Sequence, residues 1–375
     1  MSAPAPRVLS VVWNLIRGGT EGQCARTAMA HAALGGVHRV AVFRREGFFL
    51  DPVEAACGPV HDFGIRRMVS LDTMRRIRGL AEYIRANGIN LLHAWDIDAA
   101  IFASRAAGRA GIPCLTSRRD LAQHLFRPQA LAAEPRRTRR RGRGGQRRRH
   151  RSRSRGGGCS ASRVHLIPNI LDLEEFDRLS GRPLPPGIGL PDAPLAVMVA
   201  RLDPEKDVAT FLRAVAAART DCPSLQAVIA GDGVERGMLE SLSDRLGLSG
   251  RVTFLGDFQA VPALLRRCTA GVLTPSANEG MSNTLLEYMA AGLPVIATDC
   301  GGNREVVEHG RTGFITAAGD AESIARHLRT LLEAPEQAAR MGACGRETIA
   351  REHSPAQVVR QFDRLYREVL SHGAA

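Results

Sequence analysis

Lysine is almost absent from this chain of 375 residues. Of its 51 basic side chains only Lys206 is a lysine, which indicates a general bias toward arginine. Lys206 stands in Arg201-Leu-Asp-Pro-Glu-Lys206, directly after the apolar run 195–200. Because lysine is a compact point charge and arginine a planar fork, a turn that carries one of each can hold phosphate. The alternative is that Lys206 lies on a solvated loop by chance and has no function.

Aromatic residues, long apolar runs and paired cysteines are also scarce. Aromatics make up 5% of the chain, so leucine, valine and alanine must build the core. No apolar run approaches the roughly 20 residues of a membrane helix, and Met1–Pro6 lack the features of a signal peptide. The eight cysteines include no C-x-x-C pair, which argues against a zinc site and a disulfide framework. We expect a reduced, cytoplasmic protein with no metal site.

Acidic residues are missing from one segment. Residues 136–155 hold 12 arginines and no acid, and without them the net charge of +13 falls to +1. Such a tract could hold the phosphate backbone of a nucleic acid. No aromatic residue lies between 127 and 163 to stack on bases, so we expect no specific nucleic-acid partner, although a basic nucleic-acid-binding protein stays an alternative.

Predicted strands and helices alternate along the chain. The predicted strands are 8–12, 39–43, 89–93, 113–117, 195–200, 225–230, 251–255, 270–274 and 294–298. The predicted helices are about 23–34, 72–86, 97–109, 207–219, 234–246, 259–267, 283–291, 321–333 and 355–370. This alternation is typical of βαβ units on a parallel sheet. We expect an α/β protein with two doubly wound, Rossmann-like domains, residues 1–167 and 168–354, facing a ligand cleft.

Three strand ends in the second domain carry polar or small residues suited to a ligand. The first is the Arg201/Lys206 turn, and the second is Gly231-Asp-Gly233, where small residues let a ligand approach the backbone. The third is Glu279-Gly-Met-Ser-Asn-Thr-Leu-Leu-Glu287, with a helix beginning near Thr284 whose free amides could bind a diphosphate. Thr284 and Glu287 also have capping-box spacing, which would make Glu287 structural.

The order and spacing of these motifs resemble the family-4 retaining glycosyltransferases of GT-B fold (glycosyl transferases group 1). The matching segments are Val164-His-Leu-Ile-Pro-Asn169, the Arg201/Lys206 turn, Gly231-Asp-Gly233, Phe254-Leu-Gly256, the E-x7-E pair Glu279/Glu287, Ala291–Ala297, Gly301–Glu305, Gly310–Phe314 and the N-terminal turn Gly18-Gly19-Thr-Glu21.

The resemblance implies a metal-independent, cofactor-free hexosyltransferase that moves a sugar, with retention, from a nucleotide sugar to an acceptor hydroxyl. The acceptor would be a glycan or a lipid-linked molecule of cell-envelope or exopolysaccharide synthesis, met at the inner face of the membrane. Residues 355–375 would cross back to the N-terminal, acceptor-side domain. The implied donor-binding residues are Arg201 and Lys206 on the diphosphate, Glu279 with Gly280, Met281, Ser282 and Asn283 on the sugar, Glu287 on the ribose, Gly231 and Gly233 beside them, and Gly19 from the first domain.

Two departures from the family pattern affect these expectations. Where the family often has a histidine near the reacting centre, this chain has Arg118-Arg119-Asp120, so the catalytic candidates besides Glu279 are Arg119 and the strand-end His93, which could instead be structural. Residues 127–160 have the family's approximate length but an arginine- and glycine-rich composition that cannot bury a strand. We interpret that segment as a frame-shifted reading that would impair the enzyme, with a genuine basic segment as the alternative.

Two further alternatives stay open. A GT-B relative that isomerises nucleotide sugars would share the donor motifs. Asp96-Ile-Asp98 has the D-x-D pattern of metal-dependent transferases, but this triplet is common by chance and lies in the first domain.

Overall fold

The computed structural model describes residues 4–65, 71–118 and 163–373, and the described chain divides into two compact units. The first contains the chain up to Arg118, the segment that ends at Ile167, and the chain from Gln361 on; the second contains Pro168–Arg360. Arg119 and the arginine-rich segment 127–160 lie outside the described residues, so the catalytic and frame-shift hypotheses stay predictions. In the described residues no helix is long and apolar enough to cross a membrane.

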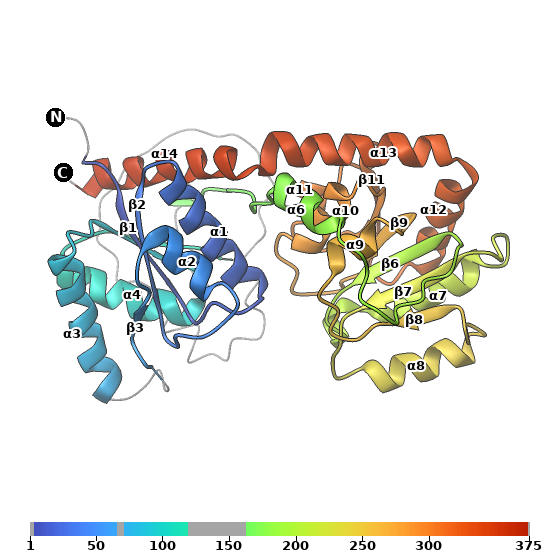
Figure 1. Ribbon diagram of the computed structural model, residues 1–375, viewed down its shortest axis with the longest axis horizontal. Coiled ribbons are helices and arrows are strands. Elements are labelled where there is room, and N and C mark those ends of the chain that lie inside the picture. The colour runs from blue at the N-terminus through green and yellow to red at the C-terminus, as the bar shows by residue number, and fades with distance from the viewer. Residues whose placement is uncertain (1–3, 66–70, 119–162, 374–375) are drawn as a thin grey trace. The chain divides into compact units, whose positions relative to one another are not determined.

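The first unit is a five-stranded parallel sheet with helices between its strands (Figure 1). Its strand order is β3-β2-β1-β4-β5. The elements are β1 (Arg7–Val12), α1 (Gly19–Ala33), β2 (Val37–Val42), α2 (Leu50–Cys57), β3 (His61–Asp62), α3 (Leu71–Ala86), β4 (Leu91–Ala94), α4 (Ile97–Ala110), β5 (Cys114–Thr116) and the C-terminal part of α14 (Pro355–Gly373).

The two faces of this sheet differ in polarity. Alternate strand residues such as Leu9, Val11 and Leu92 form an apolar core with α3 and α4. The opposite face carries a buried polar cluster, in which Ser10 accepts from Trp95 Nε1 at 2.9 Å and is hydrogen-bonded to His38 Nε2 at 2.8 Å. The other members of the cluster are His31 on α1, His93 on β4 and Tyr366 on α14.

Burial of His38 makes the first unit sensitive to acid. Desolvation, followed by the charges of His31 and His93, holds the pKa of His38 well below 6.5, and burial also lowers the pKa of His31. Below pH 6.5 the unfolded chain therefore binds protons that the folded chain does not, so stability is present above that pH and is lost as pH falls.

We expect the melting temperature to fall as the pH is lowered from 7 to 5. One histidine that stays neutral in the folded chain would reduce the free energy of unfolding by up to about 2 kcal/mol at pH 5. His38→Gln should flatten this pH dependence, while His165→Gln, at an exposed position, should leave it unchanged. Thermal unfolding followed by circular dichroism across this range checks the expectation, and an equal slope in His38→Gln would contradict it.

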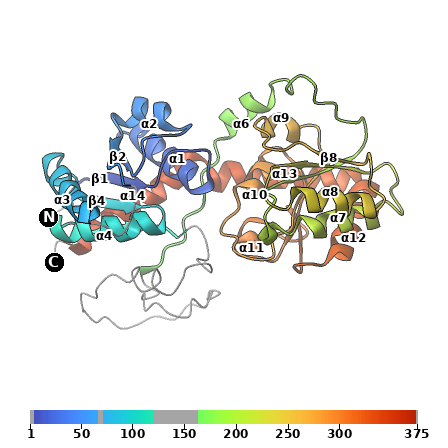
Figure 2. The ribbon, with the colours of Figure 1, turned by 90° about the horizontal axis from the view of Figure 1, so that it is seen from below.

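The second unit is a six-stranded parallel sheet of order β11-β10-β9-β6-β7-β8, with helices on both faces (Figure 2). Its strands are β6 (Leu195–Val199), β7 (Gln226–Ala230), β8 (Val252–Phe254), β9 (Ala270–Leu273), β10 (Val295–Thr298) and β11 (Gly313–Thr316). Its helices are α6 (Leu173–Ser180), the 3-10 turn η2 (Pro204–Lys206), α7 (Val208–Ala218), α8 (Arg236–Arg245), α9 (Val261–Leu265), α10 (Asn283–Ala290), α11 (Asn303–Val306), α12 (Ala321–Glu333), α13 (Pro335–Thr348), the π-helix η3 (Ile349–His353) and the start of α14.

Strand order reverses in the middle of this second sheet. The chain runs outward from β6 through β7 to β8 and then returns to the other side of β6 as β9. Loops that leave two such strands on opposite faces create a crevice at their carboxyl ends, the topological switch point where ligands of open α/β sheets bind. The first sheet has its own switch point between β1 and β4.

Helix α10 is locked to this switch point by Tyr288, which is fully buried. The Tyr288 hydroxyl accepts from the Val199 amide at 2.7 Å, at the end of β6, and donates to Val272 on β9 at 3.3 Å. Gly271 makes room for the ring, because a Cβ at that position would overlap with it. The hydroxyl of Thr284 adds a hydrogen bond to the Val199 carbonyl at 3.2 Å.

The predicted strands and helices in the described residues are confirmed to within a few residues. In the described residues, sequence reasoning missed α2, β3, α6, α11, β11 and α13, and the short helices η2 and η3.

Candidate functional site at the β6–β9 switch point

The turn that follows β6 is fixed by hydrogen bonds from the loop that follows β9. The buried Thr274 hydroxyl lies 3.2 Å from the Lys206 carbonyl oxygen and 2.9 Å from that of Asp207. Ser276 donates its amide to the Glu205 carbonyl at 2.9 Å, and Asn278 donates its side-chain amide to Glu205 Oε2 at 3.1 Å. The two strand-end loops therefore form one polar unit across the switch point.

Lys206 and Glu279 meet in this unit. Lys206 Nζ lies 2.7 Å from Glu279 Oε2, and the two side chains are only 17% and 10% exposed. Asn278, just before Glu279, has a left-handed φ of 55°, a conformation unusual for a residue with a side chain and enriched at functional sites. The sequence predicted both residues as donor ligands, and the structure adds their direct ion pair.

Both members of this pair can still bind a ligand. An ammonium group has three N–H donors, and one of them serves Glu279. The other two can donate to phosphate oxygens, so one compact cation can link a carboxylate to a diphosphate. Because the pair occupies only Oε2, Glu279 Oε1 can accept from sugar hydroxyls.

Arg201 lies at the start of the same turn and is more accessible. Its side chain is 70% exposed and pairs with Asp203 at 2.6 Å and Glu205 at 3.4 Å. Because the guanidinium itself is exposed, it can exchange these carboxylates for phosphate at little cost, since surface ion pairs contribute only about 0–1 kcal/mol.

Helix α10 begins beside Glu279 with Ser282 as its N-cap, and the Ser282 side chain makes no cap hydrogen bond. The capping-box alternative is wrong, because Thr284 is the second residue of the helix and its hydroxyl bonds to Val199. Glu287 lies half-buried on α10, one turn after Asn283. The start of a helix carries partial positive charge and favours anions.

Gly231 and Gly233 make room for the backbone of the neighbouring turn. Both stand after β7, and a Cβ at Gly231 would overlap with the carbonyl oxygen of Ala200, while one at Gly233 would lie 2.6 Å from that of Leu202. Gly231 also has a φ of 143°. These glycines admit the backbone of the Arg201 turn, and Leu202 N–H donates to the Asp232 carbonyl at 2.9 Å. Their direct approach to a ligand stays a prediction.

The switch point of the first unit contains Gly18 and Asp96. Gly18, which has no side chain, is the N-cap of α1, whose first residue is Gly19. Asp96 accepts from the amides of Ala99 at 2.6 Å and Trp13 at 2.9 Å. Burial raises its pKa to about 6, although both hydrogen bonds favour the ionised form. Asp96 is thus the N-cap of α4, a structural explanation for the D-x-D triplet.

His93 is part of the core and not of an accessible site. It is fully buried, with Nδ1 hydrogen-bonded to the Tyr366 hydroxyl at 2.9 Å and Nε2 to Ser117 Oγ at 2.8 Å. Its ring also packs on Trp95 with 4.3 Å between centroids. The structure therefore corrects the catalytic hypothesis for His93: one ring nitrogen is held by Tyr366 on α14 and the other by Ser117 after β5.

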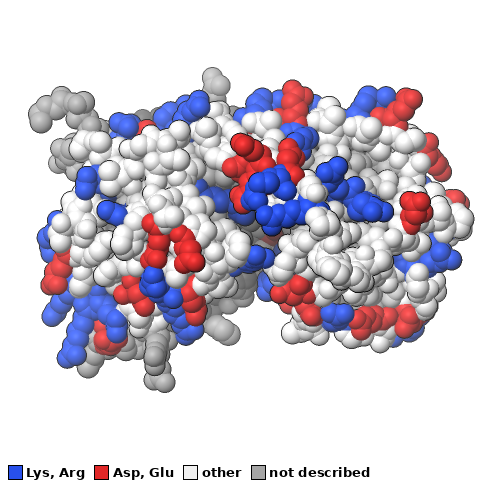
Figure 3. All heavy atoms as spheres, viewed as in Figure 1, with Lys and Arg blue, Asp and Glu red and all other residues white. Residues whose placement is uncertain are grey.

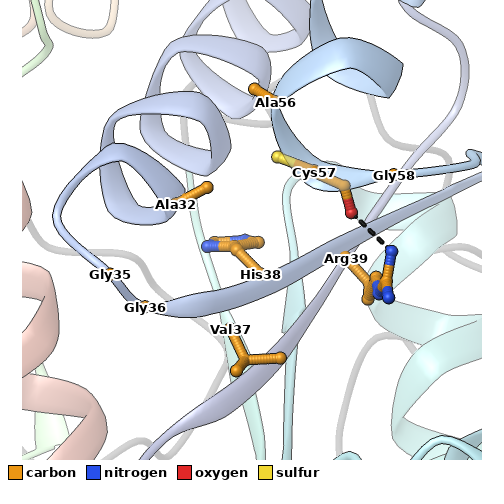
Figure 4. A pocket seen from close by; sticks show the side chains of 9 residues that line it. All are labelled: Ala32, Gly35, Gly36, Val37, His38, Arg39, Ala56, Cys57 and Gly58. Carbon is orange, nitrogen blue, oxygen red and sulfur yellow. Dashed lines mark hydrogen bonds between the residues drawn. The ribbon is translucent and has the colours of Figure 1, made fainter.

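A hollow of about 390 Å³ lies elsewhere in the first unit, between the C-terminal ends of α1 and α2 and the start of β2 (Figure 4). Arg39 donates to the Cys57 carbonyl at 2.7 Å across it, and burial raises the pKa of the Cys57 thiol to about 11. The hollow is at the amino ends of the strands, opposite the edge where α/β sheets bind ligands.

Two parallel-sheet units in succession, each with a switch point, are the arrangement of the GT-B fold. Solved structures share this fold: the Anabaena protein Alr3699/HepE superposes with a TM-score of 0.77 at 20% identity, covering 96% of this chain and 100% of that one. Residues 187–348 match the family described as glycosyl transferases group 1. That matched region contains the switch-point site.

Two curated relatives match part of the chain. The N-acetyl-alpha-D-glucosaminyl L-malate synthase of Bacillus anthracis is 34% identical over 143 residues, 38% of this chain and 37% of the relative. The alpha-D-kanosaminyltransferase of Streptomyces kanamyceticus is 32% identical over 183 residues, 48% of this chain and 47% of the relative. The chain thus spans about half the length of the curated relatives it matches, or less.

Proposed function

We propose that the protein is a retaining glycosyltransferase that moves a sugar from a nucleoside diphosphate to an acceptor hydroxyl. The observation that carries the proposal is the Lys206–Glu279 pair at the switch point, beside the start of α10. This arrangement places a cation and a helix N-terminus for the diphosphate next to a carboxylate for the sugar. In the transfer the bond from the anomeric carbon to the diphosphate oxygen breaks, and the acceptor oxygen bonds to that carbon on the same face.

Each residue at the site has a proposed role. Lys206 and Arg201 neutralise the charge that develops on the leaving diphosphate. Glu279 and the backbone from Gly280 to Asn283 hold the donor sugar, and Glu287 holds the ribose. Support for a nucleotide sugar comes from the Anabaena neighbour, whose structures were determined with UDP and with UDP-glucose.

We propose that the reaction needs no metal ion, because Lys206 and Arg201 supply the positive charge that a divalent cation would supply. Transfer should then be unchanged by EDTA. Loss of transfer in EDTA that manganese restores would contradict this and would return attention to Asp96 and Asp98.

The product distinguishes this function from nucleotide-sugar isomerisation. The chain should be incubated with UDP-, GDP- and ADP-sugars and a mixture of glycan and lipid-linked acceptors, followed by NMR of the new linkage. An α-linked product from an α-linked donor supports retaining transfer. Consumption of the donor with only an isomeric nucleotide sugar formed would support the isomerase. Salt-sensitive nucleic-acid binding without turnover would support the basic-protein alternative.

We also propose that the acceptor belongs to cell-envelope or exopolysaccharide synthesis and is met at an anionic membrane surface. Ile16 and Phe48 are 45% and 54% exposed, in the loops after β1 and β2. The Arg17 guanidinium lies 3.8 Å from the centre of the Phe48 ring. An apolar pair with a basic residue suits the interface of anionic lipids. Elsewhere on the face shown in Figure 3, acidic and basic side chains of the described residues are interspersed.

Phe48→Ser is expected to lower co-sedimentation with phosphatidylglycerol vesicles several-fold, because it removes the exposed apolar side chain. Leu34→Ser is the matched control, since Leu34 is 56% exposed but follows the far end of α1. Equal sedimentation of wild type, both variants and a vesicle-free sample would contradict membrane association.

A further inference from the structure

Two residues of the described chain that are not glycine have a left-handed backbone conformation, and both stand next to the Lys206–Glu279 pair. Asp207, with a φ of 45°, directly follows Lys206. Asn278, with a φ of 55°, directly precedes Glu279. This conformation crowds the Cβ atom, so it persists only where neighbouring contacts hold it. The contacts that hold these two residues therefore help to place the ion pair.

Asp207 is held by helix capping. It is the N-cap of α7, and its Oδ1 accepts from the Thr210 amide at 3.3 Å while its Oδ2 accepts from the Thr210 hydroxyl at 2.7 Å. Because aspartate is a common N-cap, the conformation of Asp207 has a structural cause.

Asn278 is held by Glu205 instead. Its side-chain amide donates to Glu205 Oε2 at 3.1 Å, and this orientation of the amide is fixed because a carboxylate can only accept. The other end of the amide, Asn278 Oδ1, is buried and has no hydrogen-bond partner among the described residues. The contact with Glu205 therefore anchors the side chain that precedes Glu279.

Glu205 is itself tied to both loops of the site. Arg201 Nη2 lies 3.4 Å from Glu205 Oε1, the oxygen that Asn278 does not use. The Glu205 carbonyl accepts from the Ser276 amide at 2.9 Å, so the backbone and the side chain of Glu205 both bond to the loop after β9. An exchange of Arg201 from Glu205 to a phosphate would leave the bond to Asn278 in place.

The backbone that follows Glu279 has separate support. The Gly302 amide donates to the Gly280 carbonyl at 3.0 Å, and a Cβ at Gly301 would overlap with the Glu279 carbonyl oxygen. Loss of the Glu205 contact should therefore alter the chain before Glu279 and leave the chain after it in place.

We propose that Glu205 is a positioning residue for sugar transfer: through Asn278 it fixes the backbone that directs the Glu279 carboxylate toward the donor sugar. The inference rests on the proposed function, because it names what positions the sugar-binding carboxylate. Glu205 does not touch the donor in this scheme. It should therefore affect the transfer step more than the binding of the diphosphate, which Lys206 and Arg201 hold.

The test compares kcat for sugar transfer with the affinity for the nucleoside diphosphate. Glu205→Ala should lower kcat about 10-fold, the effect expected for the loss of one hydrogen bond to a charged group. Calorimetry with whichever of UDP, GDP and ADP binds the wild-type chain most tightly should show no loss of affinity, because Arg201 loses a competing carboxylate. Glu205→Gln should keep most of the wild-type kcat, since an amide oxygen can still accept from Asn278.

Variants of Asn278 test the conformation directly, and they do so even where Glu205→Ala fails to fold. Glycine adopts the left-handed conformation without a clash and alanine does not, so Asn278→Gly should keep a higher kcat than Asn278→Ala. In the Asn278→Gly background, Glu205→Ala should cost clearly less than in wild type, because no side chain remains for Glu205 to hold.

Asp221→Ala is the matched control. Asp221 forms a surface pair with Arg329 at 2.5 Å and precedes β7, at the amino edge of the same sheet. It should leave kcat and nucleotide affinity unchanged.

Wild-type kcat in folded Glu205→Ala, an equal loss in both Asn278 backgrounds, or equal kcat in Asn278→Gly and Asn278→Ala would overturn the proposal. A loss of nucleotide affinity as large as the loss of kcat would also overturn it, because Glu205 would then support the whole turn. If the wild-type chain forms no transfer product from any of the nucleotide sugars, the proposed function is wrong and the role of Glu205 falls with it.

Discussion

Replacement of Lys206 by alanine is expected to lower sugar transfer by roughly 10- to 100-fold or more. The substitution removes the charge-assisted hydrogen bonds to the diphosphate, each contributing about 1.5–3 kcal/mol. It also leaves Glu279, with a side chain only 10% exposed, without its ion-pair partner. The measurement is kcat/KM for the nucleotide sugar at fixed acceptor concentration.

Lys206→Arg should also lose activity, although it keeps the charge. The ammonium of Lys206 lies 2.7 Å from Glu279 in a largely buried pair, and a planar guanidinium cannot direct donors to a carboxylate and a phosphate from one point. Arg311→Ala is a control, because Arg311 forms a surface pair with Glu308 at 2.7 Å. Full activity in Lys206→Arg would mean that the single lysine has no special function.

Glu279→Gln should lower the transfer rate by about 100-fold, the second large effect. The amide keeps the shape of the side chain but loses the negative charge opposite Lys206, and it accepts more weakly from sugar hydroxyls. Melting temperature should change little, since a glutamine oxygen can still accept from Lys206. Glu308→Gln is the control, because Glu308 is 61% exposed in its surface pair with Arg311. It should leave the rate unchanged.

Glu287 should behave differently from Glu279. Since Ser282 is the N-cap of α10, Glu287 has no capping function to lose, and Glu287→Gln should mainly weaken nucleotide binding with a smaller effect on kcat. A lower melting temperature with unchanged nucleotide affinity would show that Glu287 is structural after all.

The sequence predicted the architecture and the main site because both depend on local patterns. Alternating strands and helices define parallel sheets, and strand ends of a parallel sheet meet at one edge, so Lys206 and Glu279 could be expected to lie close together. Elements that are short or weakly patterned were missed because they lack such a local pattern. β3 has two residues, and α13 contains two glycines and few large apolar side chains.

The remaining differences come from tertiary contacts that no local pattern reveals. Gly231 was predicted to let a ligand approach the backbone, and the structure shows that its missing side chain also makes room for the backbone of Ala200. His93 looked like a strand-end catalyst, but Tyr366, 273 residues away, occupies its ring nitrogen. Glu205 was visible only as an acidic residue in a polar turn, and its contact with Asn278 spans 73 residues.

Binding of a nucleoside diphosphate at the β6–β9 switch point is tested most directly by isothermal titration calorimetry of UDP, GDP and ADP into the wild-type chain and Lys206→Ala. We predict that at least one nucleotide binds the wild type with a stoichiometry of one, that Lys206→Ala weakens it by about 10-fold or more, and that Arg311→Ala does not. Absence of binding by all three nucleotides, or equal affinity in wild type and Lys206→Ala, would contradict the assignment of this site.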